Sequence, residues 1–131
     1  EIERTLALSP RVSSRVEAAW MGGTDLDRFS RYTFDAFENR LHGYPTASIR
    51  YDAGAVARTV TSWAARGWRA DIFGDIAVVR DPGFGDRLRG YPGAGAAVEL
   101  SGPFRTLWAV EWGYGFRAHS QALRMTAYRT F

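Results

Sequence analysis

Residues 68–80 read WRADIFGDIAVVR. Two apolar runs in this stretch flank the pair Gly74-Asp75, and such a pair between apolar runs signals a two-residue β-hairpin turn. The stretch therefore predicts two short antiparallel strands joined at Gly74. It also opens the glycine-rich part of the chain, because ten of the 14 glycines lie from Gly67 to Gly115. We expect a sheet to begin here.

The residues that follow continue the strand pattern. Residues 96–100 (AAVEL) and 104–112 (FRTLWAVEW) are apolar runs, and Gly102-Pro103 separates them. Residues 112–116 (WGYGF) predict a glycine-hinged turn that is rich in aromatic rings. Residues 118–130 fit a final strand better than a helix.

The residues before this stretch favour helices. Ser9-Pro10 predicts the start of a helix over residues 10–20, because serine caps helices and proline is tolerated at the first helical position. The strongest helical pattern covers residues 24–42, where apolar side chains recur on one face. A third helix is expected over residues 53–66, with a strand as the alternative because Thr59-Val60-Thr61 is β-branched.

Helices followed by antiparallel strands are typical of an α+β domain. We expect residues 1–131 to form a single domain of two or three N-terminal helices packed on a C-terminal antiparallel sheet of four or five strands. The core is expected to combine one face of the long helix with apolar residues of the other elements: Leu26, Phe29, Phe37, Leu41, Val60, Trp63, Ile72, Ile76, Val78, Leu107 and Val110.

Composition narrows the classes of function. The chain has no cysteine, which excludes disulfide frameworks and thiolate metal sites and leaves the compartment open. The net charge is only +3 and the basic residues are scattered, so no nucleic-acid-binding arm is predicted. No apolar run reaches the length of a membrane-spanning helix, so we expect a soluble chain without a membrane span. The oligomeric state, and whether the chain is part of a longer or processed protein, stay open.

A nine-residue stretch occurs twice in similar form. Residues 37–45 read FENRLHGYP and residues 84–92 read FGDRLRGYP. We interpret Gly-Tyr-Pro as one loop motif that occurs twice. Glycine permits a positive φ in it, and proline fixes the backbone conformation where the chain leaves the loop. An old duplication is the alternative, because further matches follow at an offset of 47 or 48 residues.

Known site motifs are absent. The two histidines, His42 and His119, have no zinc-ligand spacing, and no group of acids forms a calcium loop. The paired glycines lack the third glycine and the lysine of phosphate-binding loops. We therefore expect no metal and no cofactor. His42 is expected at the C-terminal end of a helix, where a positive charge is favourable.

The aromatic content suggests a binding function. Glycine-rich turns that carry large rings favour a non-catalytic interaction module, which contacts a protein partner or a small apolar ligand. The candidate contact residues are Tyr91, Trp112, Tyr114 and Phe116.

A metal-independent endoribonuclease is the alternative function. Such an enzyme needs a base, an acid and a cation for the phosphate. The candidates are Glu99 or Glu111, Arg105 or Arg117, and His119, which all fall in the predicted sheet. Whether the chain is an enzyme stays open, because cross-strand ion pairs would use the same residue types. A third hypothesis is a fold that encloses an apolar pocket for a small ligand.

Overall fold

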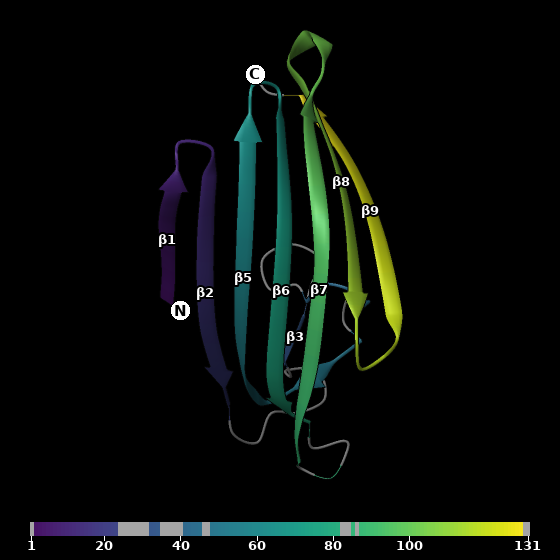
Figure 1. The fold of residues 1–131 in the computed structure, drawn as a ribbon. Coiled ribbons are helices and arrows are strands. Elements are labelled where there is room, and N and C mark those ends of the chain that lie inside the picture. The colour runs from purple at the N-terminus through teal and green to yellow at the C-terminus, as the bar shows by residue number, and fades with distance from the viewer. Residues whose placement is uncertain are drawn as a thin grey trace.

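The structure is a computed structural model that describes residues 2–23, 32–34, 41–45, 48–81, 85 and 87–129. Seven long strands form one antiparallel sheet in the order β1-β2-β5-β6-β7-β8-β9, and two short strands, β3 and β4, form a separate pair. Figure 1 shows the seven strands side by side in a single curved layer. The strands are β1 (Ile2–Ser9), β2 (Val12–Gly22), β3 (Tyr32–Thr33), β4 (Arg50–Tyr51), β5 (Ala53–Ala65), β6 (Trp68–Arg80), β7 (Leu88–Ser101), β8 (Thr106–Gly115) and β9 (Ser120–Arg129).

The expected α+β fold is wrong. The described residues contain no α-helix, only a short 3-10 turn at Pro103–Arg105. The helix expected over residues 10–20 is strand β2, and the one expected over residues 53–66 is strand β5. Most of the helix expected over residues 24–42 lies outside the described residues, and its part at Tyr32–Thr33 is strand β3.

The hairpin expected at Gly74-Asp75 is also wrong, because β6 runs through it without a break. Gly74 pairs with Thr59 of β5 on one side and with Ala94 of β7 on the other. A turn at Gly74 would interrupt the pairing of β6 with both β5 and β7. The sheet therefore has seven strands, where four or five were expected, although its antiparallel character and the strands at residues 96–100, 104–112 and 118–130 are confirmed in outline.

The two faces of the sheet differ because successive side chains of a strand point to opposite faces. One face, which we call the inner face, is contacted by described parts of the segment between β2 and β5. Phe34, Leu41, Ile49 and Tyr51 of that segment form the buried core with Ala77 and Val79 of β6. In Figure 1, strand β3 of this segment lies behind the lower half of the sheet.

The opposite face, which we call the outer face, has no layer over it among the described residues. Four residues expected in the core lie there and are substantially exposed, namely Ile72, Ile76, Val78 and Val110. Trp63 lies on the same face and is also exposed, whereas Leu41 and Val60 are buried as expected. The expected core members Leu26, Phe29 and Phe37 lie outside the described residues.

Candidate functional site

Residues 41–45, which we call the docked segment, lie on glycines of the inner face. A Cβ atom at Gly113 would lie 2.7 Å from the backbone nitrogen of Gly43, and one at Gly115 would lie 2.9 Å from the Gly43 oxygen. A Cβ at Gly93 would overlap the carbonyl oxygen of His42. Real Cβ atoms do not approach backbone this closely, so only glycine lets the segment sit against β7 and β8.

Gly43 adds a second constraint from within the docked segment. Its φ of +80° lies in the left-handed region, which side-chain-bearing residues rarely adopt. A Cβ there would overlap the backbone of Tyr114 and Gly115. The sequence interpretation of Gly43 as a residue that needs a positive φ is therefore confirmed, although it follows no described helix.

His42 is held by Asp75 of β6. Both the backbone N–H and the ring Nδ1 of His42 lie within hydrogen-bond distance of Asp75 Oδ2, at 2.7 and 2.6 Å. The ring also packs on Phe73, with ring centroids 3.7 Å apart. Gly95 makes room for that packing, since a Cβ there would lie 2.5 Å from the Phe73 ring.

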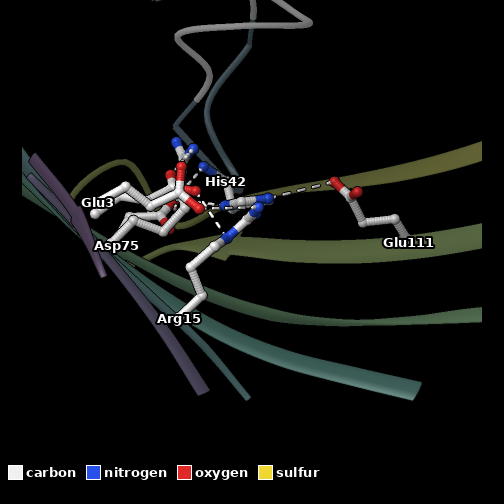
Figure 2. A network of polar contacts seen from close by, with 7 residues as sticks. Glu3, Arg15, His42, Asp75 and Glu111 are labelled. Atoms are coloured by element: carbon white, nitrogen blue, oxygen red, sulfur yellow. Dashed lines mark hydrogen bonds and ion pairs between the residues drawn. The ribbon is translucent and has the colours of Figure 1, made fainter. Parts of the chain in front are cut away.

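Asp75 is a buried carboxylate within a larger network of charges. Burial raises its pKa, but hydrogen bonds from His42 and the charges of His42 and Arg58 outweigh this effect, so the net pKa lies below the usual range. Arg58 Nε lies 3.3 Å from the second Asp75 oxygen, and Arg58 also contacts Glu17 at 3.4 Å. Arg15 extends the network to Glu17 at 2.8 Å and to Glu3 at 3.9 Å (Figure 2).

The other side of the imidazole faces Glu111 of β8. His42 Nε2 lies 3.7 Å from Glu111 Oε1, which is an ion-pair distance but too long for a hydrogen bond. Nε2 is buried and has no hydrogen-bond partner among the residues that the structure describes. Figure 2 shows the ring between the two carboxylates, which come from β6 and β8. A change in the charge of the ring therefore changes its electrostatic interaction with both carboxylates.

Tyr44 anchors the far end of the docked segment. Its hydroxyl donates to the Pro92 carbonyl at 2.8 Å and accepts from the Arg117 backbone N–H at 3.2 Å. Its ring meets Tyr91 edge to face with centroids 5.7 Å apart. Burial raises the pKa of Tyr44, so its hydroxyl stays protonated and can donate. Ser120 contributes a further hydrogen bond from its hydroxyl to the Gly43 carbonyl, at 2.5 Å.

These contacts correct the interpretation of the repeated stretch. The first Gly-Tyr-Pro, residues 43–45, lies in a turn, but the second, residues 90–92, lies within β7. Two loops are therefore the wrong interpretation. Instead the first copy contacts the second, through the Tyr44 hydroxyl on Pro92 and the Tyr44 ring on Tyr91. The question of a duplication stays open.

The outer face has a different chemistry. All five tryptophans of the chain lie on it and are more than one third exposed: Trp20, Trp63, Trp68, Trp108 and Trp112. Every acidic side chain of the described strands lies on the inner face, as the cross-strand pairing shows. The outer face is therefore mostly apolar, with uncharged polar residues such as Ser14, Thr61 and Gln121 and with arginine at a few positions near its margins.

The structure separates the four predicted contact residues. Trp112 and Tyr114 lie on the outer face of β8 with stacked rings 6.5 Å apart. Phe116, in the following turn, meets Tyr114 edge to face at 5.3 Å and is half-exposed. Tyr91 lies on the inner face, where the Arg117 guanidinium lies 5.3 Å from the centre of its ring.

The predicted ribonuclease residues are dispersed among different partners. Glu99 contacts the Tyr128 hydroxyl at 3.5 Å, Glu111 faces His42, and the His119 ring lies 3.2 Å from the Tyr114 hydroxyl. Arg117 reaches the Gly90 carbonyl, and Arg105 lies in the 3-10 turn that precedes β8. No contact found among the described residues joins a catalytic base, an acid and an arginine of this set.

Two features are absent from the described ranges. No group of three or more histidine or acidic side chains there could hold a metal ion. No helix in the same residues has the length and apolar character needed to cross a membrane. Comparison with protein-family models, with curated proteins and with solved structures found no match for this chain.

The sequence interpretation missed the docked segment and its partner Asp75. It assigned His42 to a helix end and treated the glycines as turn residues. A usable signal was present, since Gly93-x-Gly95 and Gly113-x-Gly115 both have the spacing that places two glycines on one face of a strand. Two such pairs on neighbouring strands create a flat area that another backbone can approach.

Proposed function

We propose that the chain is a non-catalytic interaction module whose outer face lies against the hydrocarbon of a lipid bilayer. The observation that carries this proposal is the sorting of side chains between the two faces of the sheet. All five tryptophans lie on the outer face, and the acids of the described strands lie on the inner face. A sheet that worked in water would bury the apolar face and expose the charged one.

The dimensions of the outer face support a lipid environment. Along β6 its apolar residues extend from Trp68 to Val78, which corresponds to about 33 Å at about 3.3 Å per residue. The hydrocarbon core of a bilayer is about 30 Å thick. Trp68 and Trp20 lie near opposite ends of the strands, and tryptophan is favoured where hydrocarbon meets water.

A protein partner on this face is less well supported. Interfaces between proteins that also exist separately are only slightly more apolar than the rest of a protein surface and contain many hydrogen bonds. The outer face offers few groups for such bonds. Trp112, Tyr114 and Phe116 fit the lipid contact, because rings near the end of a strand can reach the polar boundary of the bilayer. Tyr91 belongs instead to the inner face, so we propose no contact role for it.

A small apolar ligand is also less well supported. A hollow of about 320 Å³ lies between Val16, Thr59, Gly74 and Ile76. Val16 and Ile76 are about half-exposed, so the hollow is shallow. Small-molecule sites bury most of the ligand surface, which a shallow hollow does not. A lipid acyl chain that lies along the whole face fits this surface better.

Quenching of tryptophan fluorescence tests the proposal directly, because all five tryptophans report on one face. The protein is reconstituted into phosphatidylcholine vesicles with acyl chains brominated at defined depths, and iodide in water serves as the opposing quencher. We expect strong quenching by brominated lipid and weak quenching by iodide. Strong quenching by iodide together with no effect of bromine would overturn the proposal, as would failure of the folded protein to float with the vesicles.

The ribonuclease alternative stays a prediction with its own test. The reagent is a fluorescent RNA of mixed sequence, incubated with EDTA between about pH 5 and pH 8, the range in which histidine titrates. The alternative requires cleavage by the wild type and its loss in folded His119→Ala. The dispersed positions of Glu99, Arg105 and His119 lead us to expect no cleavage.

A further inference from the structure

The His42 ring lies between two carboxylates that come from different strands. Its Nδ1 lies 2.6 Å from Asp75 Oδ2 on β6, and its Nε2 lies 3.7 Å from Glu111 Oε1 on β8. The residue is 5% exposed. Bulk water therefore has little access to either nitrogen, and the charge of the ring must be balanced by protein groups.

The neutral ring fits this place poorly. Its single ring proton belongs on Nδ1, because Asp75 is ionised and can only accept. Nε2 then carries a bare lone pair, finds no hydrogen-bond donor within the described part of the chain and faces the negative oxygen of Glu111. A buried acceptor without a partner is unfavourable, and an adjacent carboxylate makes it more so.

The doubly protonated ring fits it well. Both nitrogens are then donors, one toward each carboxylate, and the positive charge lies between two negative ones. The 3.7 Å distance to Glu111 would shorten to a hydrogen bond with a small movement of the Glu111 side chain, which is partly exposed. The same amino acid therefore stabilises the docked segment to different degrees in its two charge states.

We propose that protonation of His42 controls the docking of residues 41–45 on the inner face of the sheet. The segment is bound tightly when the ring is doubly protonated and loosely when the ring is neutral. Docking is therefore strongest on the acidic side of neutrality and weakens as the pH rises. This control of docking by His42 is independent of the lipid contact, because the docked segment lies on the opposite face of the sheet.

The other charged groups around the ring do not cancel this effect. From β5, Arg58 contacts the Asp75 oxygen that does not face His42, and Glu17 of β2 lies beside Arg58. From β9, Arg124 lies opposite Glu111 in the ladder, on the same face of the sheet. From β7, Gly93 lies against the His42 carbonyl and carries no charge. The two carboxylates on β6 and β8 remain the groups that face the two ring nitrogens.

Hydrogen exchange of the backbone amides of residues 41–44 measures docking in the whole chain, held in lipid or detergent, because Pro45 has no amide hydrogen. Rates are divided by those of an unstructured peptide at each pH, which removes the intrinsic pH dependence of exchange. Between about pH 5.5 and pH 8 we expect protection of these amides to fall by about tenfold in the wild type. Protection that stays constant over this range would overturn the proposal.

A matched pair of variants separates this effect from simple loss of structure. Glu111→Gln removes the charge that faces Nε2, and its protection should change by less than about twofold over the same pH range. Glu99→Gln removes an inner-face charge that contacts Tyr128 instead, and it should behave as the wild type. Full pH dependence in Glu111→Gln would also overturn the proposal.

Nitrogen NMR of the ring identifies the group that titrates. The chain has only two histidines, so His119→Gln leaves His42 as the single imidazole. The protection of residues 41–44 and the two ring nitrogen shifts should then change with the same midpoint. Different midpoints would show that another group controls docking and would contradict the assignment to His42.

Discussion

Asp75 joins the docked segment to the sheet through charge. Its side chain is fully buried and accepts from the His42 backbone N–H, from the His42 ring and from Arg58. Removing one member of a buried ion pair costs more than the pair itself contributes, because the remaining charge keeps its desolvation penalty. Substitution at this one residue should therefore have a large effect.

Asp75→Asn should lower the free energy of unfolding by about 3 kcal/mol, because it removes the fully buried negative charge that His42 and Arg58 share. Urea unfolding in detergent micelles, followed by tryptophan fluorescence, measures the loss. Asp71→Asn is the matched control, since Asp71 lies on the same face of the same strand and pairs with the exposed Arg69. It should cost less than about 1 kcal/mol. Equal losses in the two variants would contradict the role given to Asp75.

The lowered pKa of Asp75 predicts how this effect depends on pH. A carboxyl group whose pKa is lower in the folded state contributes stability above its unfolded pKa of about 4 and loses it as the pH falls through the folded value. The stability difference between the wild type and Asp75→Asn should thus shrink as the pH falls below about 4. Unfolding curves at several pH values check this. A difference that persists under strongly acidic conditions would show that the charge of Asp75 is unimportant.

At the scale of the elements, the glycines of β7 and β8 decide whether the segment between β2 and β5 can lie on the sheet. Gly113→Ala should displace the docked segment, because the new methyl group would meet Gly43 at 2.7 Å and the His42 side chain at 3.2 Å. We expect a loss of about 2 kcal/mol in unfolding free energy and faster hydrogen exchange at the amides of residues 41–44.

Gly90→Ala is the control for this prediction. Gly90 lies on the outer face of β7, and a Cβ there meets no atom within 4 Å. The substitution should leave exchange at residues 41–44 unchanged and should be neutral or slightly stabilising. If Gly113→Ala behaved in the same way, the close approach of the docked segment to β8 would be wrong.

The spacing of apolar residues explains why strands were taken for helices. Val12, Val16 and Trp20 recur every four residues, which places them on one side of a helix and equally on one face of a strand. Val56 and Val60 of β5 repeat the same ambiguity. Near the C-terminus, short apolar runs bounded by glycine and proline gave a clearer signal, so β7, β8 and β9 could be predicted in outline. The contacts of His42 with Asp75 and Glu111 depend on three distant parts of the chain, and no local pattern reports them.

At the scale of the whole molecule, the accessible surface area is larger than that of a compact protein of the same mass. Its accessible area is 8900 Å², whereas a compact monomer of 14.6 kDa has about 6,900 Å². The excess arises because a single sheet, covered in part on one side, cannot enclose a core in the way two packed layers do. An apolar environment at the outer face would remove much of that exposed area from water.

Two neighbouring alanines of β7 test this view of the whole molecule. Ala96 lies on the outer face and Ala97 on the inner face. In lipid, Ala96→Arg should destabilise the protein by about 3 kcal/mol, because it places a charge in hydrocarbon, while Ala97→Arg should cost far less on the polar face. Unfolding in vesicles measures both. If Ala97→Arg proved the more harmful of the two, the outer face would not be the one in lipid.

The arrangement of β2 and β5 has a consequence for the order of assembly. These strands are neighbours in the sheet although residues 23–52 separate them in sequence, and every other neighbouring pair is joined by a much shorter connection. The glycine surface that receives residues 41–45 exists only once β7 and β8 have paired. We therefore expect docking to be the last event of folding. The seven-stranded sheet would form first, and the segment between β2 and β5 would pack on it afterwards.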